Sequence, residues 1–102
     1  MVLPDVNVLL YAVRPDYPRH DRCRGWLEAT VNSPEPFGMS LQALASVIRI
    51  LTNARIFREP IPPEQAIQFC EGLLASPNCR LIQPEMRRWD IFAGLCRRAK
   101  AN

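Results

Sequence analysis

The chain has 102 residues, 48% of them hydrophobic, which is enough for one modest core and predicts a single domain over residues 1–102. No apolar run approaches the roughly 18 to 20 residues of a membrane span, and the start lacks a secretory signal pattern, so we expect a cytoplasmic protein outside the membrane. The formal net charge is +3, and twelve of the thirteen basic residues are arginines, which suit phosphate contacts but also follow from GC-rich codon usage.

The first predicted element is a short buried strand that starts at Val2 and runs into a turn or a helical start before Val13. Its apolar residues are continuous rather than alternating, which is typical of a central strand in a parallel sheet. Pro15 and Pro18 interrupt this pattern, and helical spacing begins at Arg19. The apolar face of this helix would contain Cys23, Trp26, Leu27, Thr30 and Val31.

The segment SPEPFGM predicts a connection with room for a very short strand, because it contains two prolines and a glycine. Ser40 then stands at the N-cap position of a second helix. This helix is apolar over much of its circumference, so we expect it to be well buried. Its apolar residues are Leu41, Leu44, Ala45, Val47, Ile48, Ile50 and Leu51.

A third helix is predicted to begin at Pro63 and Glu64, because proline in the first turn and an acid near the N-terminal dipole both favour a helix start. The apolar run Cys79–Ile82 predicts a second strand, and the segment QPE at 83–85 predicts the start of a last helix. The buried face would contain Ile67, Cys70, Leu73 and Leu74 in the third helix, and Met86, Trp89, Ala93 and Cys96 in the last.

The order of strand, helices, strand and helix predicts an α/β layer structure. We expect Val2–Asp5 and Cys79–Ile82 to be neighbouring parallel strands, because helices separate them. The four cysteines are widely spaced without the pattern of zinc ligands, and most lie among apolar residues, so we expect free thiols rather than disulfides.

Asp5 and Asn7 place a carboxylate and an amide in an otherwise apolar run. Parallel sheets bind ligands beyond the carboxyl ends of their strands, and a carboxylate buried there needs a cation, hydrogen-bond donors or a raised pKa. Mg²⁺ or Mn²⁺ is the natural partner of such a hard oxygen ligand. The alternative is that Asp5 caps a turn and Asn7 bonds the backbone.

Four segments carry a family resemblance: PDVNVLLYAV at 4–13, HDRCRGWL at 20–27, SVIRILTNARIF at 46–57, and SPNCRLIQP at 76–84 followed by Trp89. Together they resemble the PIN-domain toxins of bacterial VapBC-type toxin–antitoxin systems over essentially the whole chain. The resemblance implies a parallel sheet wrapped by helices and Mg²⁺- or Mn²⁺-dependent endonucleolytic cleavage of RNA. It also implies a homodimer, neutralised by a cognate antitoxin whose C-terminal segment enters the active-site groove.

The resemblance also assigns roles to individual residues. Asp5 matches the family's first metal-binding acid, and Asn7 matches the polar position beside it. Arg49 matches a residue that would hold a phosphate or orient the acids, although a salt bridge within the fold, even to Asp5, is equally compatible with the sequence. Thr52 and Asn53 belong to the same polar cluster, where they would contact substrate or close their helix.

Two departures from the family pattern stand beside these matches. Ser46 occupies the place where many PIN domains carry a glutamate. The family also has a further strand and helix with two more aspartates, and Asp90 matches neither of them, so the resemblance implies a C-terminally incomplete domain. We therefore expect the 102-residue chain alone to be a poor nuclease.

Two other functions remain open on the sequence. A noncatalytic PIN-like module would bind an antitoxin or a second toxin subunit through apolar helix surfaces. A phosphotransferase of the haloacid-dehalogenase type also begins with an aspartate after its first strand, but its second position is a carboxylate rather than Asn7, and no downstream lysine motif is evident.

Overall fold

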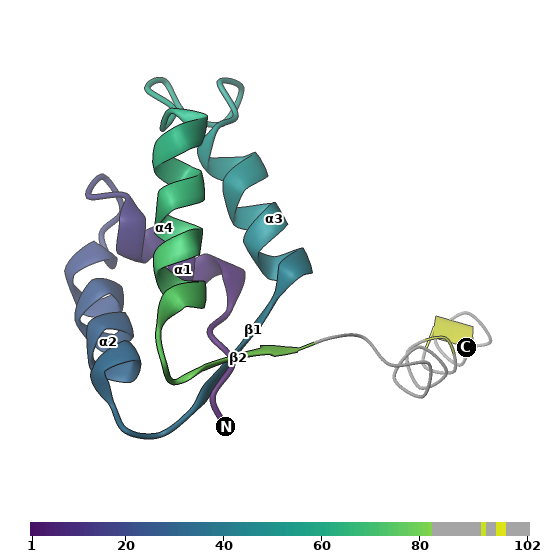
Figure 1. Cartoon of the computed structure of the whole chain (residues 1–102). Helices are drawn as coiled ribbons and strands as arrows, with labels where there is room; N and C mark the ends of the chain where they lie inside the picture. Colours follow the sequence, from purple (N-terminus) through teal and green to yellow (C-terminus); the bar gives the residue numbers. More distant parts are fainter. Residues whose placement is uncertain (83–92, 94–95, 98–102) are drawn as a thin grey trace.

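The computed structural model describes residues 1–82, 93, 96 and 97. In this part the chain forms an α/β fold with a parallel sheet covered by helices, as predicted (Figure 1). The predicted last helix and Asp90 lie outside the described residues, apart from the single positions Ala93 and Cys96. The elements are α1 (Val6–Val13), α2 (His20–Asn32), β1 (Phe37–Ser40), α3 (Leu41–Leu51), α4 (Pro63–Ala75) and β2 (Cys79–Ile82).

The strand β1 lies between the N-terminal segment and β2. Its Phe37 N–H donates to the Asn78 carbonyl at 3.0 Å, whereas the next N–H, that of Gly38, donates to the Val2 carbonyl at 2.7 Å. Successive N–H groups of a strand point to opposite edges, so the two partners flank β1. Both run parallel to it. The prediction that Val2–Asp5 and Cys79–Ile82 are direct neighbours is therefore wrong, although their parallel direction is confirmed.

Gly38 shows why a strand fits into the proline- and glycine-punctuated segment. A Cβ at this position would lie 2.6 Å from Ile82 Cδ1 and 3.1 Å from Leu3 Cγ. Side chains from both neighbouring segments thus approach the β1 backbone closely, and a glycine within a strand often marks such an approach. The glycine that suggested a connection is favoured by the packing of the sheet.

The predicted buried central strand at Val2 is also wrong. Val2 forms only an isolated bridge to Phe37, and its exposed fraction is 48%, with 55% for Leu3. The rest of the apolar run is helical from Val6, as the alternative of a helical start predicted. The extended conformation ends before Val6 because the apolar side chains that follow are buried by forming helix α1. Those that are buried are Leu9, Leu10 and Ala12.

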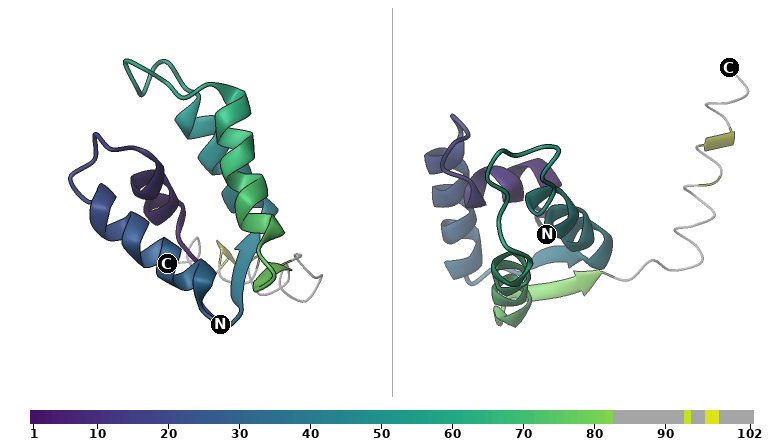
Figure 2. Two further views of the ribbon diagram at one scale, coloured as in Figure 1. Left: turned by 60° about the vertical axis from the view of Figure 1, so that its left-hand side comes forward. Right: turned by 90° about the horizontal axis from the view of Figure 1, so that it is seen from above.

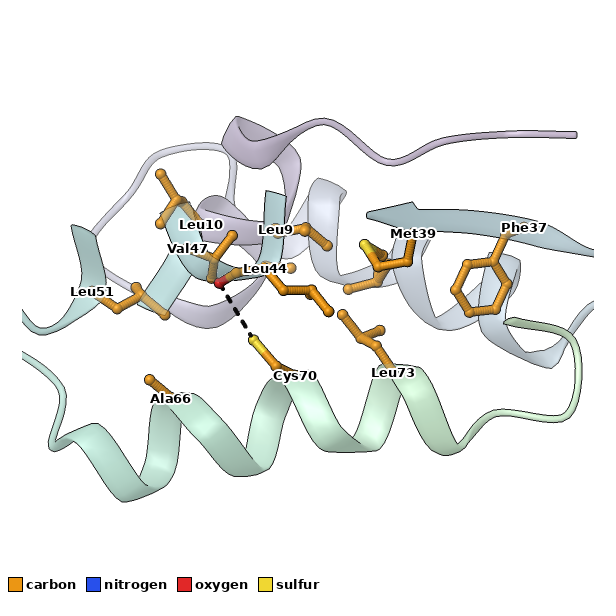
Figure 3. Close-up of a cluster of buried hydrophobic side chains, with 12 residues drawn as sticks. Leu9, Leu10, Phe37, Met39, Leu44, Val47, Leu51, Ala66, Cys70 and Leu73 are labelled. Carbon is orange, nitrogen blue, oxygen red and sulfur yellow. Dashed lines mark hydrogen bonds between the residues drawn. The ribbon is translucent and has the colours of Figure 1, made fainter. Parts of the chain in front are cut away.

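The core lies where α1, α3 and α4 meet beside β1 (Figure 3). Side chains of α4 point towards α3, and the Cys70 thiol lies 3.9 Å from the Leu44 carbonyl oxygen that accepts its weak hydrogen bond. Burial raises the pKa of Cys70, which keeps the thiol neutral. The prediction of free thiols is confirmed for Cys23, Cys70, Cys79 and Cys96.

The helix starts follow the predicted chemistry. The Ser40 hydroxyl accepts the Ala43 N–H at 3.1 Å, which confirms the N-cap of α3, and α4 begins at Pro63. The buried faces are narrower than predicted, because several apolar side chains at helical spacing face outward. These are Trp26, Leu41 and Leu74. None of the helices in the described part of the chain is long and apolar enough to span a membrane.

Candidate active site

Asp5 ends the N-terminal segment and stands at the N-cap of α1. Its carbonyl oxygen accepts the Leu9 N–H at 3.1 Å, but its carboxylate makes no capping hydrogen bond. The side chain is exposed rather than buried, so it needs no internal cation or donor to compensate for lost solvent. The carboxylate is therefore open to a ligand from solution.

The edge of the sheet at which Asp5 lies is the carboxyl end of its strands. The N-terminal segment and β1 run parallel through the bridge between Val2 and Phe37, and three residues further along each they reach Asp5 and Ser40. Asn7 is exposed in the first turn of α1. The structure thus brings the predicted carboxylate and amide to the edge where parallel sheets bind ligands.

Arg49 lies in the last turn of α3 with an exposed side chain. Its Nη2 donates a hydrogen bond to the Ser46 hydroxyl at 3.3 Å, which places both residues on one face of the helix. Within residues 1–82 the ion pairs join Arg14 to Asp16 and Arg24 to Glu28, and neither involves Arg49. A neutral hydroxyl therefore orients this guanidinium, whose charge stays available.

Thr52 and Asn53 close α3. The Thr52 hydroxyl donates to the Ile48 carbonyl at 2.8 Å, and the Asn53 side-chain oxygen accepts the Arg55 N–H at 2.8 Å. An eleven-residue helix is about 16 Å long, so these residues lie far along α3 from its start at Ser40. The Thr52 hydroxyl also lies 3.4 Å from the Arg49 carbonyl, so the candidates form two groups in the described part, Asp5 with Asn7 and Arg49 with Thr52 and Asn53.

The described residues do not by themselves fit a complete metal centre. They contain no group of three or more His, Cys, Asp or Glu side chains placed to hold one ion. Mg²⁺ is usually held by one or two carboxylates together with waters and substrate phosphates, and Asp5 is one exposed carboxylate of this kind. No metal-dependent step follows from these residues alone.

A groove that the sequence did not predict runs between α2 and α4. Figure 2 shows the course of these two helices, α2 in blue and α4 in green. This α2–α4 groove is a hollow of about 360 Å³, and a second hollow of about the same volume, lined mainly by α1, α2 and the segment between them, shares Leu27, Glu28 and Phe69 with it. The sequence feature that could have indicated this groove is a pair of apolar residues four positions apart on each helix. The apolar lining from these helices comprises Leu27, Val31, Phe69 and Leu73.

The parallel sheet wrapped by helices, with an open carboxylate at its carboxyl edge, is consistent with the PIN-like class of fold. No protein-family model matches the chain. The Ribonuclease VapC43 of Mycobacterium tuberculosis is 42% identical over 102 residues, which is the whole chain and 69% of the relative's length.

Two further relatives from the same organism give similar matches. Ribonuclease VapC33 is 39% identical over 95 residues, 93% of this chain and 66% of the relative. Ribonuclease VapC31 is 36% identical over 102 residues, the whole chain and 72% of the relative. These relatives match 93% to 100% of the chain at 36% to 42% identity. The chain therefore belongs to the VapC ribonuclease family.

Proposed function

We propose that this chain is a metal-dependent endoribonuclease toxin of a toxin–antitoxin system, which cleaves RNA phosphodiester bonds. The observation that carries the proposal is the match of the whole chain to proteins named VapC ribonucleases, at 36% to 42% identity for VapC31 and VapC43. The position of Asp5 supports it, because an open carboxylate lies at the edge where parallel sheets bind ligands.

The proposed cofactor is Mg²⁺ or Mn²⁺, with Asp5 as one ligand. Such an ion would stabilise negative charge on the phosphate and activate a water molecule for attack. Asn7 would orient the substrate or a water through its amide. The described His, Cys, Asp and Glu side chains form no group of three that would hold the ion, so the RNA phosphate itself would supply further contacts.

Arg49 would hold a phosphate of the substrate. Its guanidinium is exposed, hydrogen-bonds to the neutral Ser46 and has no carboxylate partner in the described ranges. A planar guanidinium can contact two phosphate oxygens at once. Thr52 and Asn53 would shape the turn after Arg49 and thereby influence substrate binding.

The proposed protein partners are a cognate antitoxin and a second copy of this chain. The VapC name of the relatives supports the antitoxin. The α2–α4 groove and the exposed side chains of Trp26, Leu41 and Leu81 supply apolar surface on which either partner would bury area. These surfaces also support the noncatalytic alternative, a module that binds its partners without cleaving RNA. The described residues support it too, because they contain no group of three metal-binding side chains.

Cleavage of a single-stranded RNA tests the proposal. The chain would be compared with a fusion that adds the residues that VapC43 has outside the matched region, each with Mg²⁺, with Mn²⁺ and with EDTA. We expect metal-dependent cleavage by the fusion and weak cleavage by the chain alone. Antitoxin binding without cleavage by either protein would favour the module, and equal cleavage in EDTA would reject metal dependence.

A further inference from the structure

The loop between α3 and α4 carries two arginines that the candidate active site leaves unused. Residues 36–58 contain no aspartate or glutamate, yet they carry Arg49, Arg55 and Arg58. Arg55 and Arg58 lie in the loop of residues 53–59, here termed the arginine loop, which follows α3 at the end away from β1 (Figure 1). With two arginines and one glutamate, Glu59, the loop has a net positive charge, which favours a local positive potential.

Hydrogen bonds from backbone and side-chain groups fix the backbone conformation of the arginine loop. The Asn53 carbonyl accepts the N–H groups of Ile56 and Phe57, both at 3.1 Å, while its side chain accepts the Arg55 N–H. Just beyond the loop, the Ile61 N–H donates to the Leu51 carbonyl at 2.9 Å and closes it at its base. The loop is therefore a closed turn rather than an extended linker.

Arg14 anchors the loop from the other side. Its guanidinium lies 3.9 Å from the centroid of the Phe57 ring, and its Nη1 donates to the Glu59 carbonyl at 2.9 Å. Tyr17 packs edge-on against the same ring, at 6.1 Å between centroids. The Arg14 side chain is only 11% exposed, so this anchor is largely buried. Phe57 is held inward, and the arginines on either side of it face solvent.

The two loop arginines have no protein partner within the described residues. Both side chains are exposed, and neither takes part in a side-chain hydrogen bond or ion pair there. Two acids lie near Arg58, around a hollow of about 430 Å³. Asp16 is paired with Arg14, so Glu59 is the remaining acid on that rim. Hydrogen bonds fix the loop backbone that carries the two arginines, and their guanidinium groups are free to bind an anion.

We propose that the arginine loop binds the ribose-phosphate backbone of single-stranded RNA, a role that rests on the proposed ribonuclease function. Guanidinium groups match phosphate oxygens geometrically, and a loop that is already ordered loses little conformational entropy on binding. The loop contacts phosphates rather than bases, so it strengthens binding without selecting a sequence. It acts as a substrate-binding surface and not as part of the cleavage chemistry.

The test measures binding without cleavage, by fluorescence anisotropy of a labelled single-stranded RNA in EDTA over a series of salt concentrations. The proteins are the wild type, the double variant R55A/R58A, and the matched control R19A/R22A, which removes two exposed arginines near the start of α2. For single strands each phosphate contact contributes about 0.7 to the slope of log affinity against log salt. We expect R55A/R58A to lower this slope by about 1.4, while the control stays unchanged.

A lysine double variant, R55K/R58K, should retain most of the slope because it keeps both charges. Equal losses in R55A/R58A and R19A/R22A, or no loss in either, would overturn the proposal. So would equally strong loop-dependent binding of a polyglutamate peptide, because the loop would then recognise acidic protein. Matching thermal unfolding curves establish that the variants are folded.

The experiments distinguish a failure of RNA binding by the arginine loop from a failure of the proposed ribonuclease activity. RNA binding that depends on the loop, in a protein that never cleaves RNA, would reject the ribonuclease and retain the loop. Cleavage with an unchanged salt slope in R55A/R58A would retain the ribonuclease and reject the loop.

Discussion

The buried face of α3 and the N-terminal segment Met1–Asp5 are both strongly apolar in sequence, yet the fold treats them differently. On α3, apolar residues recur at helical spacing, and Leu44, Val47 and Leu51 are buried. In the N-terminal segment, Val2 and Leu3 remain about half exposed beside a single bridge to β1. Helical spacing thus specifies its own buried face, whereas burial of a short apolar strand depends on which segments pair with it.

The two regions should also differ in what they contribute, the packed helices to stability and the N-terminal edge to function. The packed helices hold β1 and the start of α3 in place, while the lightly covered N-terminal edge presents Asp5 to solvent. Substitutions in the two regions should therefore have different consequences. Core changes should lower the free energy of unfolding, and changes at the edge should affect function with little loss of stability.

The largest stability effect is expected for Leu51→Ala. Leu51 is fully buried, and removing a buried leucine side chain leaves a cavity that costs about 3 kcal/mol. Leu3→Ala, at a residue that is 55% exposed, should change the free energy of unfolding by less than about 0.5 kcal/mol. Urea unfolding of both variants measures the difference. Equal losses would show that the N-terminal edge is as well packed as the core.

The next largest effect is expected for Arg14→Ala, which removes the cation–π contact with Phe57 and the hydrogen bond to the Glu59 carbonyl. We expect a loss of about 2 kcal/mol in the free energy of unfolding. Arg14→Lys keeps the charge but not the planar fork, so it should lose less than the alanine variant. A wild-type stability in Arg14→Ala would mean that the loop is held without this anchor.

Gly38→Ala should have a smaller effect, about 1 kcal/mol, because the added Cβ meets Ile82 and Leu3. The end of the Ile82 side chain can rotate away, which limits the cost. Gly72→Ala is the matched control, since a Cβ there meets nothing within 4 Å. If thermal unfolding shows Gly38→Ala to be no less stable than Gly72→Ala, β1 is not enclosed from both sides as described.

The smallest effect is expected for Asp16→Asn and is visible mainly through pH. The side-chain hydrogen bond from Arg14 holds the pKa of Asp16 below its ordinary value of 3.8. A carboxylate with a lowered pKa stabilises the folded state above its ordinary pKa, and this contribution is lost as the pH falls through the folded value. The small stability difference between wild type and Asp16→Asn should therefore exist at neutral pH and vanish in acid. A difference that grows in acid would contradict the pairing.

The sequence predicted the helical part of the fold well because the relevant interactions are local. The Ser40 cap, the Pro63 start and the spacing along α3 all act within a few residues. It did not predict β1 as the middle strand, because that depends on Val2 and Asn78 arriving from distant parts of the chain. Two prolines and Gly38 made the segment resemble a connection.

The candidate site divides in the same way. The placement of Asp5 after the N-terminal strand segment and of Ser46 three residues before Arg49 followed from local sequence, although the exposure of Asp5 did not. The anchoring of the arginine loop depends on Arg14 meeting Phe57 and Glu59, more than forty residues later, and no periodic pattern encodes that contact. Arg55 and Arg58 therefore gained a functional interpretation only from the fold.

The central claim, that the carboxylate at the N-terminal edge serves RNA cleavage, is tested most directly by Asp5→Asn. The substitution would be made in the fusion that carries the VapC43 residues outside the matched region, with Asp21→Asn, another exposed acid, as the matched control. Mg²⁺-dependent cleavage of single-stranded RNA should fall by at least about a hundredfold in Asp5→Asn and stay at the parent rate in Asp21→Asn, with unfolding curves unchanged. Equal cleavage rates in the two variants would remove Asp5 from the active site and contradict the account.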